Sequence, residues 1–359
     1  MNAPREPALA VRSDLAGLEP YVSPQRPARY RMNTNESPYE PSPAFGLDLA
    51  NAISAVQLNR YPDKDAHELR EALSLRTGWP QDGISVANGS NEVLLQLCLA
   101  YAGTGRSVLT FEPTYSLHSL IPRMTGAEVV QLRRDDIFEV DLDAAVTAIH
   151  ERRPEILMVC SPNNPTGGLE PLPSIEALLE EAPGIVIVDE AYLEFADPGD
   201  SARHLLAEHP NLVITSTFSK AWRVAGARIG YALGHRELME GLGLVQLPYH
   251  LSALSQATAL VALRHADESM RLAAAVAEER DRIAIELQAM GVKTFPSHAN
   301  FVLFEVDDPR RVWSALLERG VLIRIYAGTP GLEHGLRVTA GRPHEADVFL
   351  AVMQEVLDE

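Results

Sequence analysis

The sequence predicts an α/β protein with a mostly parallel, doubly wound sheet and a smaller α+β domain toward the C-terminal end. Short apolar runs alternate with helix-type segments in the middle of the chain, which is typical of such a sheet. That alternation ends near Glu237. The chain also has 359 residues, which is long for a single core and favours one large domain with a smaller one.

Four short apolar runs have the character of buried strands, and they are Ser107–Phe111, Ile156–Cys160, Ile185–Val188 and Leu212–Ser216. Between them, Asp141–Arg152 and Ser174–Glu181 carry apolar residues at helical spacing. In doubly wound sheets ligands bind beyond the carboxyl ends of the strands. Polar residues that directly follow these runs are therefore the candidate site residues.

The C-terminal part predicts a different architecture. Its expected elements are a long helix from Ser252 to about Met290, a strand at Asn300–Glu305, a helix at Pro309–Arg319, strands at Val321–Ile325 and Leu336–Thr339, and a helix from His344. The proline-rich segment Pro20–Pro43 is expected to pack across a neighbour and not to join a core. We divide the chain into an N-terminal arm with part of the small domain (1–50), a large domain (51–240), and a linking helix with the small domain (241–359).

Composition excludes several classes of function. The net charge of −18 and the lack of a basic run argue against a nucleic-acid partner. No stretch approaches the roughly 20 apolar residues of a membrane span, and the N-terminus lacks the apolar centre of a signal peptide, so we expect a cytoplasmic protein. Cys98 and Cys160 lie in apolar runs and form no CxxC pair, and the 11 histidines form no metal-binding pattern.

One lysine stands out among the three in the chain. Lys220 directly follows a predicted central strand, whereas Lys64 lies in a polar turn and Lys293 follows Gly291, so both of these are expected to be solvated. An amine that must lose its proton and attack a carbonyl has to be lysine, since arginine stays charged. The alternative is a surface lysine at the start of a helix.

Residues for binding an anion occur in two places. The segment VANGSNE (Val86–Glu92) leads into a predicted helix at Val93–Ala102, and a Gly-Ser turn there would present free N–H groups. Arg228 could bind phosphate oxygens with its guanidinium, with hydroxyl groups from Thr217 and Ser219. A simple helix cap is the alternative for the turn.

Other strand ends supply a carboxylate and aromatic rings. Asp189 ends a strand and could hold a pyridine nitrogen protonated. Tyr192 and Asn164 could reach the phenolic oxygen of such a ring, and Tyr115 could stack on its face. Taken singly, these residues also suit a helix cap, a turn or a buried core tyrosine. Together the strand ends predict one site with an amine, a carboxylate, an anion anchor and an aromatic ring.

The segments SPNNPTG, VDEAYLEF, TFSKAWRVAGARIGY and LRVTAG resemble the signature segments of fold-type I pyridoxal-phosphate (PLP) aminotransferases. PYVSP, NTNESPY, NRYPD, LPYHLSALSQA and HANFVLF resemble the histidinol-phosphate aminotransferase branch of that family. The resemblance implies PLP as cofactor, a fold-type I transferase fold, and a homodimer with shared active sites.

The resemblance also implies a role for each cofactor residue. Lys220 forms the Schiff base and then moves the substrate proton, Asp189 pairs with the pyridine nitrogen, and Tyr192 and Asn164 contact the phenolic oxygen. Tyr115 stacks on the ring. The phosphate is surrounded by Gly89, Ser90, Asn91, Thr217, Ser219 and Arg228, with Tyr61 from the second subunit.

Two arginines are implied in substrate binding. Arg337 matches the arginine that binds the α-carboxylate, and Arg324 matches the position that binds the phosphate of histidinol phosphate. Tyr21 of the partner subunit and Asn35 match further substrate contacts. One pocket must take a phosphate and a carboxylate in turn, which two cationic groups suit. Without the resemblance, Arg324 could equally be a solvated arginine on an edge strand.

The resemblance therefore implies an aminotransferase that acts on histidinol phosphate and 2-oxoglutarate in histidine biosynthesis. An aromatic amino-acid aminotransferase, a threonine-phosphate decarboxylase and a non-enzymatic PLP sensor are the alternatives. A nicotinamide-dependent dehydrogenase is disfavoured because no GxGxxG follows an early strand. Among departures from the family pattern, Asn91 replaces an acidic residue, and Arg223 is expected to add a cation near the site.

Overall fold

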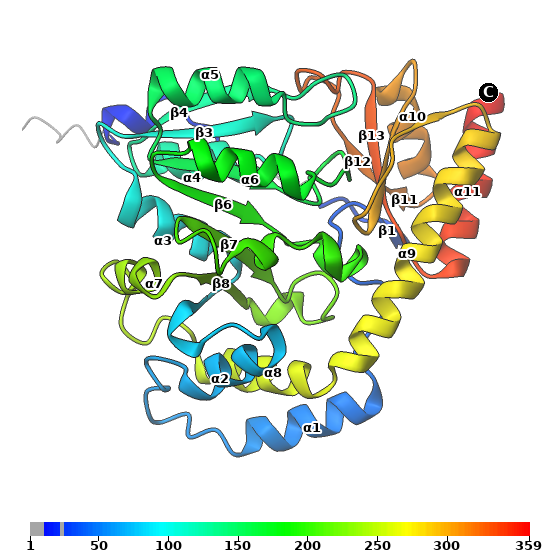
Figure 1. The fold of residues 1–359 in the computed structure, drawn as a ribbon. Helices are drawn as coiled ribbons and strands as arrows, with labels where there is room; N and C mark the ends of the chain where they lie inside the picture. Colours follow the sequence, from blue (N-terminus) through cyan, green and yellow to red (C-terminus); the bar gives the residue numbers. More distant parts are fainter. Residues whose placement is uncertain (1–10, 22–24) are drawn as a thin grey trace, which may run out of the picture.

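The computed structural model describes residues 11–21 and 25–359. Its main feature is a seven-stranded sheet (Figure 1). In spatial order the strands are β2 (Ile84–Ala87), β8 (Gly230–Gly234), β7 (Leu212–Thr217), β6 (Ile185–Asp189), β5 (Ile156–Cys160), β3 (Ser107–Glu112) and β4 (Glu128–Arg133).

Five neighbouring strands of this sheet, from β7 to β4, are parallel, and the four strands predicted from apolar runs are all among them. The prediction of a mostly parallel α/β sheet is thus confirmed. Strand β8 pairs antiparallel with β7, and β2 pairs antiparallel with β8. The sequence reasoning did not identify β2, β4 or β8.

Helices cover both faces of the sheet, because successive side chains of a strand point to opposite sides. Leu157 and Val159 of β5 belong to one buried cluster, and Ile156 and Met158 belong to the other. The helices whose buried side chains join the first cluster include α2 (His67–Thr77), α5 (Leu142–Arg152) and α6 (Leu172–Glu181), and those of the second are α3 (Ser90–Tyr101), α4 (Leu117–Met124) and α7 (Arg236–Gly243).

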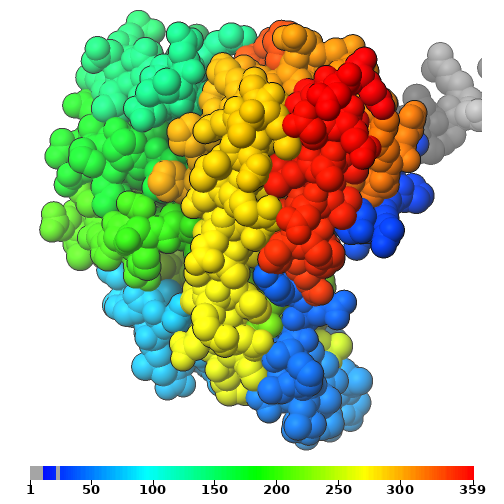
Figure 2. Space-filling view, turned by 90° about the vertical axis from the view of Figure 1, so that its right-hand side faces the viewer, coloured from blue at the N-terminus to red at the C-terminus, as the bar shows by residue number. Residues whose placement is uncertain are grey.

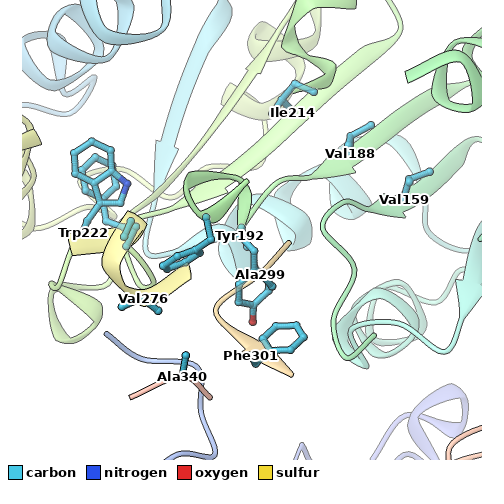
Figure 3. Close-up of a cluster of buried hydrophobic side chains, with 14 of the residues drawn as sticks. Val159, Val188, Tyr192, Ile214, Trp222, Val276, Ala299, Phe301 and Ala340 are labelled. Carbon is cyan, nitrogen blue, oxygen red and sulfur yellow. The ribbon is translucent and has the colours of Figure 1, made fainter. Parts of the chain in front are cut away.

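A smaller sheet lies beside the large one, in the order β12 (Arg324–Ile325), β13 (Gly335–Thr339), β10 (Phe301–Glu305) and β9 (Lys293–Thr294). All its pairings are antiparallel. Two further helices pack here, α10 (Pro309–Glu318) and α11 (Pro343–Asp358). The first buried cluster runs on from the large sheet at Val159 and Val188 to Phe301 and Ala340 (Figure 3).

The predicted long helix is broken in two. Helix α8 (Ala253–Arg264) packs against α1 (Pro43–Ser54), and α9 (Ala266–Ala289) carries the chain to the small sheet (Figures 1 and 2). His265 lies between them with φ −100° and ψ 23°. Its Nε2 atom lies 2.8 Å from Asp48 Oδ2 of α1, so a side-chain contact stabilises the break.

The later part of the proline-rich segment belongs to the core of its own chain, which corrects the expectation for these residues. Strand β1 (Tyr30–Arg31) pairs in parallel with β11 (Val321–Leu322), and Met32, Asn33 and Asn35 are buried. Residues 22–24 of this segment lie outside the described residues. The division at residues 50 and 240 stays a prediction. Within residues 11–21 and 25–359, no helix has the length and apolar character that a membrane span requires.

Candidate active site

A cavity of about 340 Å³ opens where the carboxyl ends of β3, β5, β6 and β7 meet the small sheet and the segment after β1. It brings together most of the residues that the sequence singled out. The predicted residues that line it are Tyr21, Asn35, Ser90, Asn91, Tyr115, Asn164, Asp189, Tyr192, Thr217, Ser219, Lys220, Arg228, Arg324 and Arg337.

Lys220 lies in this cavity, one turn beyond the end of β7. Its Nζ donates a hydrogen bond to the carbonyl oxygen of Thr34 over 3.1 Å. Burial, together with the positive charge of Arg337, lowers the pKa of Lys220 to about 8. Lys64 and Lys293 instead pair with surface carboxylates. Lys220 is therefore the lysine that can supply a neutral amine near neutral pH.

Asp189 is the last residue of β6 and its carboxylate is held on both oxygens. Oδ2 lies 3.0 Å from Nε2 of His118, and Oδ1 accepts a hydrogen bond from the Ala191 N–H at 3.2 Å. His118 is fully buried on α4. A buried carboxylate fixed in this way can pair with a protonated ring nitrogen. The sequence reasoning missed His118, since nothing local to TYSLH shows that α4 packs beside β6.

Cys160 lies next to this pair. One potential ligand atom from each of His118, Cys160 and Asp189 lies within 4.8 Å of the other two, whereas the sequence reasoning had found no such grouping. The Cys160 thiol donates to the Pro162 carbonyl oxygen, and burial raises the pKa of that thiol well above its ordinary value. Cys160 therefore lines the cavity with an uncharged thiol group.

An anion cradle forms where α3 begins. Gly89 has φ +83°, and a Cβ atom there would lie 2.5 Å from Arg228 Nη2. Glycine thus allows the guanidinium to approach the start of α3, where the positive end of the helix dipole favours an anion. Arg228 Nη1 donates to Ser219 Oγ over 3.1 Å, and Thr217 Oγ1 donates to the same oxygen over 3.0 Å. These groups suit a phosphate.

Tyr115 and Tyr192 supply aromatic groups. The Tyr115 hydroxyl donates to Asn91 Oδ1 over 3.2 Å, and its ring lies edge-on to His118. The Tyr192 hydroxyl accepts hydrogen bonds from the side-chain amides of Asn35 and Asn164. Burial raises the pKa of both tyrosines, so both remain protonated phenols.

Two arginines from paired strands complete the cavity. Arg324 of β12 and Arg337 of β13 are direct register partners. Arg337 is buried, and its Nη1 and Nη2 donate to Asn164 Oδ1 and the Asn33 carbonyl oxygen. Its Nε has no partner among the residues that the structure describes. Because Asn164 and the Asn33 carbonyl are neutral partners, the site suits an added anion.

Tyr21 and Arg223 do not lie where they were expected, whereas the contact of Tyr61 with a second subunit stays a prediction. Tyr21 lines the cavity of its own chain, whereas the resemblance implied a contact across subunits. Tyr61 lies outside the cavity, 79% exposed, and stacks on Tyr249 at a centroid distance of 4.4 Å. Arg223 does not line the cavity either, because its guanidinium pairs with Glu268 of α9 at 3.1 Å. The expectation that Arg223 adds a cation near the site is wrong.

Comparisons with known proteins agree with this geometry. The family model "Aminotransferase class I and II" matches residues 30–352. A histidinol-phosphate aminotransferase of Corynebacterium efficiens is 45% identical over 97% of this chain and 95% of the relative. One of Thermobifida fusca is 46% identical over 95% of this chain and 94% of the relative.

Solved structures also match. The histidinol-phosphate aminotransferase of Sinorhizobium meliloti, in complex with pyridoxal-5'-phosphate, superposes with a TM-score of 0.89 and 26% identity over 97% of each chain. An L-threonine-O-3-phosphate decarboxylase of Porphyromonas gingivalis matches with a TM-score of 0.78 and 24% identity, over 92% of this chain and 100% of that one, which shows the shared fold alone. The family match and the two relatives together establish that the chain belongs to the class I and II aminotransferases.

Proposed function

We propose that this chain is a PLP-dependent aminotransferase that converts L-histidinol phosphate and 2-oxoglutarate into imidazole-acetol phosphate and L-glutamate. The observation that carries the proposal is a single cavity in which a lysine amine with a lowered pKa faces two arginines on paired strands. The names of relatives that are 45–46% identical over nearly the full length support the same substrate.

PLP fits the donor groups of the cavity. Gly89 leaves room for Arg228 at the start of α3, which suits the phosphate, and Asp189, oriented by His118, suits the pyridine nitrogen. When bound, the cofactor supplies a ring that accepts the electrons released at the substrate Cα. We assign Lys220 Nζ to hold the cofactor and then to take and return the Cα proton.

We assign the remaining cofactor contacts to residues that line the cavity. Tyr115 would stack on the ring, and Tyr192 and Asn164 would contact its phenolic oxygen. Each of these side chains lines the cavity and is held by a hydrogen bond to another residue. The phosphate contacts are assigned to Gly89, Ser90, Asn91, Thr217, Ser219 and Arg228.

The substrate contacts are assigned to the small sheet. Arg337 binds the carboxylate of glutamate or 2-oxoglutarate, and Arg324 binds the phosphate of histidinol phosphate. Both guanidinium groups line the same cavity from register-paired positions, so one anionic substrate can replace the other. Tyr21 and Asn35 line the substrate side of the same space.

We further propose a homodimer in which Tyr61 reaches the cofactor phosphate of the second subunit. Tyr61 and Tyr249 stack on the surface, and exposed large apolar side chains occur in the same two segments of the chain, at Leu58, Leu244 and Leu247. Mixing Lys220→Ala and Tyr61→Ala chains tests the proposal, since a shared site would restore activity in hybrid dimers. Mixtures as inactive as either parent would contradict it. A cytoplasmic location stays a prediction.

The substrate assignment is tested with purified protein, PLP, histidinol phosphate and 2-oxoglutarate. Formation of imidazole-acetol phosphate and glutamate in equal amounts is expected. The value of kcat/KM for phenylalanine, measured in parallel, decides between this reaction and an aromatic aminotransferase. Release of CO₂ from threonine phosphate would indicate the decarboxylase. A chain that binds PLP and turns over none of these would favour a sensor.

A further inference from the structure

The hydroxyl group of Tyr192 receives hydrogen bonds from two side-chain amides. Asn35 Nδ2 donates over 2.9 Å, and Asn164 Nδ2 donates over 3.3 Å. A phenol oxygen can accept two hydrogen bonds and donate one. Since both acceptor positions are used, the hydroxyl proton must point in a third direction. Tyr192 lines the cavity, so its proton is available to a group bound there.

Each amide is held in one orientation by a residue of β13. An amide offers Nδ2 on one side and Oδ1 on the other, and its partners decide which way it faces. Arg337 donates to Asn164 Oδ1, and a guanidinium cannot accept. Thr339 Oγ1 accepts a hydrogen bond from the backbone N–H of Asn35 at 3.1 Å. The same hydroxyl group donates to the side-chain oxygen Asn35 Oδ1 at 2.9 Å. Both Nδ2 groups are thereby turned toward Tyr192.

The spacing on β13 makes the arrangement possible. Arg337 and Thr339 are two residues apart, so their side chains extend from the same face of the strand. Phe301, the register partner of Thr339 on β10, places its ring edge-on to Tyr192 at a centroid distance of 5.2 Å. Figure 3 shows Tyr192 between the strand ends of the large sheet and Phe301 of the small sheet.

We propose that Thr339 is a positioning residue of the reaction: acting through Asn35, it keeps the Tyr192 hydroxyl as a donor to the phenolic oxygen of the cofactor. This inference rests on the proposed function, because it requires the cofactor ring in the cavity. Thr339 and Arg337 differ in one respect. Substrate carboxylate competes with Asn164 for the guanidinium of Arg337, whereas Thr339 itself is not assigned to bind substrate.

The surroundings of Tyr192 agree with a donor role. Burial raises the pKa of Tyr192 well above its ordinary value, so the proton is present at working pH. The titratable and charged groups that face it are Lys220, whose Nζ lies 5.5 Å from the ring centroid, and Arg337, Cys160 and Tyr115. A hydrogen bond donated to an oxygen anion stabilises that anion and lowers its pKa.

The test is a pH titration of the visible absorbance of the PLP-loaded enzyme. Thr339→Val keeps the shape of the side chain and removes the hydroxyl group, so Asn35 can turn Oδ1 toward Tyr192 and accept its proton. We expect the pH midpoint of the absorbance change to rise by about one unit. We also expect kcat to fall about tenfold, with KM for 2-oxoglutarate changed by less than about twofold.

Two matched variants separate the hydroxyl from the packing. Thr339→Ser should restore the wild-type midpoint. Thr215→Val should leave it unchanged, because Thr215 is also buried in a strand and its Oγ1 has no partner among the described residues. If Thr339→Val does not fold, Asn35→Ala removes the same branch and should give the same rise.

The inference is overturned if Tyr192→Phe raises the midpoint while Thr339→Val and Asn35→Ala do not. It is also overturned if Thr339→Ser shifts as far as Thr339→Val. Either result leaves the proposed function intact. By contrast, wild-type protein that develops no visible absorbance with PLP would refute the proposed function itself.

Discussion

The two halves of the cavity differ in their charge. The sheet-edge half, at the carboxyl ends of the large sheet, combines Lys220 and Arg228 with the carboxylate of Asp189. The small-sheet half contributes Arg324 and Arg337, and its cavity-lining residues from 324 to 337 include no acidic side chain. The first half is therefore suited to a group with both basic and anionic parts. The second is suited to anions alone, which is why we assign substrate exchange to it.

The largest effect is expected in the sheet-edge half. Lys220→Ala should lower kcat by at least about four orders of magnitude, because the amine that holds the cofactor and moves the proton is lost. Covalent attachment of the cofactor, measured by mass spectrometry after borohydride reduction, should disappear as well. Lys293→Ala is the matched control, since Lys293 pairs with Glu305 at the surface. Attachment that persists at another lysine would break the assignment.

Arg337→Ala should give the next largest loss. A charge-assisted, two-point contact with a carboxylate contributes about 2–5 kcal/mol, so kcat/KM for 2-oxoglutarate should fall by about 30-fold to several thousand-fold. The variant also removes the hydrogen bond that Arg337 donates to Asn164 Oδ1. Rapid-mixing measurement of the half-reaction with 2-oxoglutarate checks this. A loss confined to histidinol phosphate would exchange the roles of the two arginines.

Arg324→Ala should act selectively. We expect kcat/KM for histidinol phosphate to fall by about 10- to 100-fold, as for one charge-assisted contact at a half-buried position. The half-reaction with glutamate should change by less than about threefold. Equal losses for histidinol phosphate and glutamate would show that Arg324 is not specific for the phosphate group.

The smallest effect is expected on the pH dependence of cofactor uptake, where Arg337 of the small-sheet half acts on Lys220 of the sheet-edge half. Burial and the charge of Arg337 hold the pKa of Lys220 at about 8, below its ordinary value of 10.5. Only the neutral amine attacks an aldehyde, so the rate at which apo-protein takes up PLP should rise with pH and level off above about pH 8. In Arg337→Gln the midpoint should move to higher pH, because one positive charge is removed. A midpoint that stays in place would mean that burial alone lowers the pKa.

The sheet-edge half was largely predictable from sequence. Its residues follow apolar runs that form parallel strands, and the carboxyl ends of parallel strands meet at one edge of the sheet. In the small-sheet half the resemblance implied Arg324, Arg337 and Asn35, but not the hydrogen bonds that hold them. Asn33 and Asn35 are buried and bond to Arg337 and Thr339, 304 positions away along the chain. No local pattern reports such partners. Strand β8 was not predicted because its sequence, GYALG, is glycine-rich and has a weak β-propensity.

The interruption at His265 has a mechanical consequence. Helix α9 has 24 residues and is about 36 Å long, and the small sheet is attached near its far end. Any rotation of α9 would therefore pivot about its N-terminal end, which is tied to α1 by the His265–Asp48 contact and to the loop after Lys220 by the Arg223–Glu268 pair. A swing of only about 5° about that pivot would carry the far end through about 3 Å, roughly the length of one hydrogen bond.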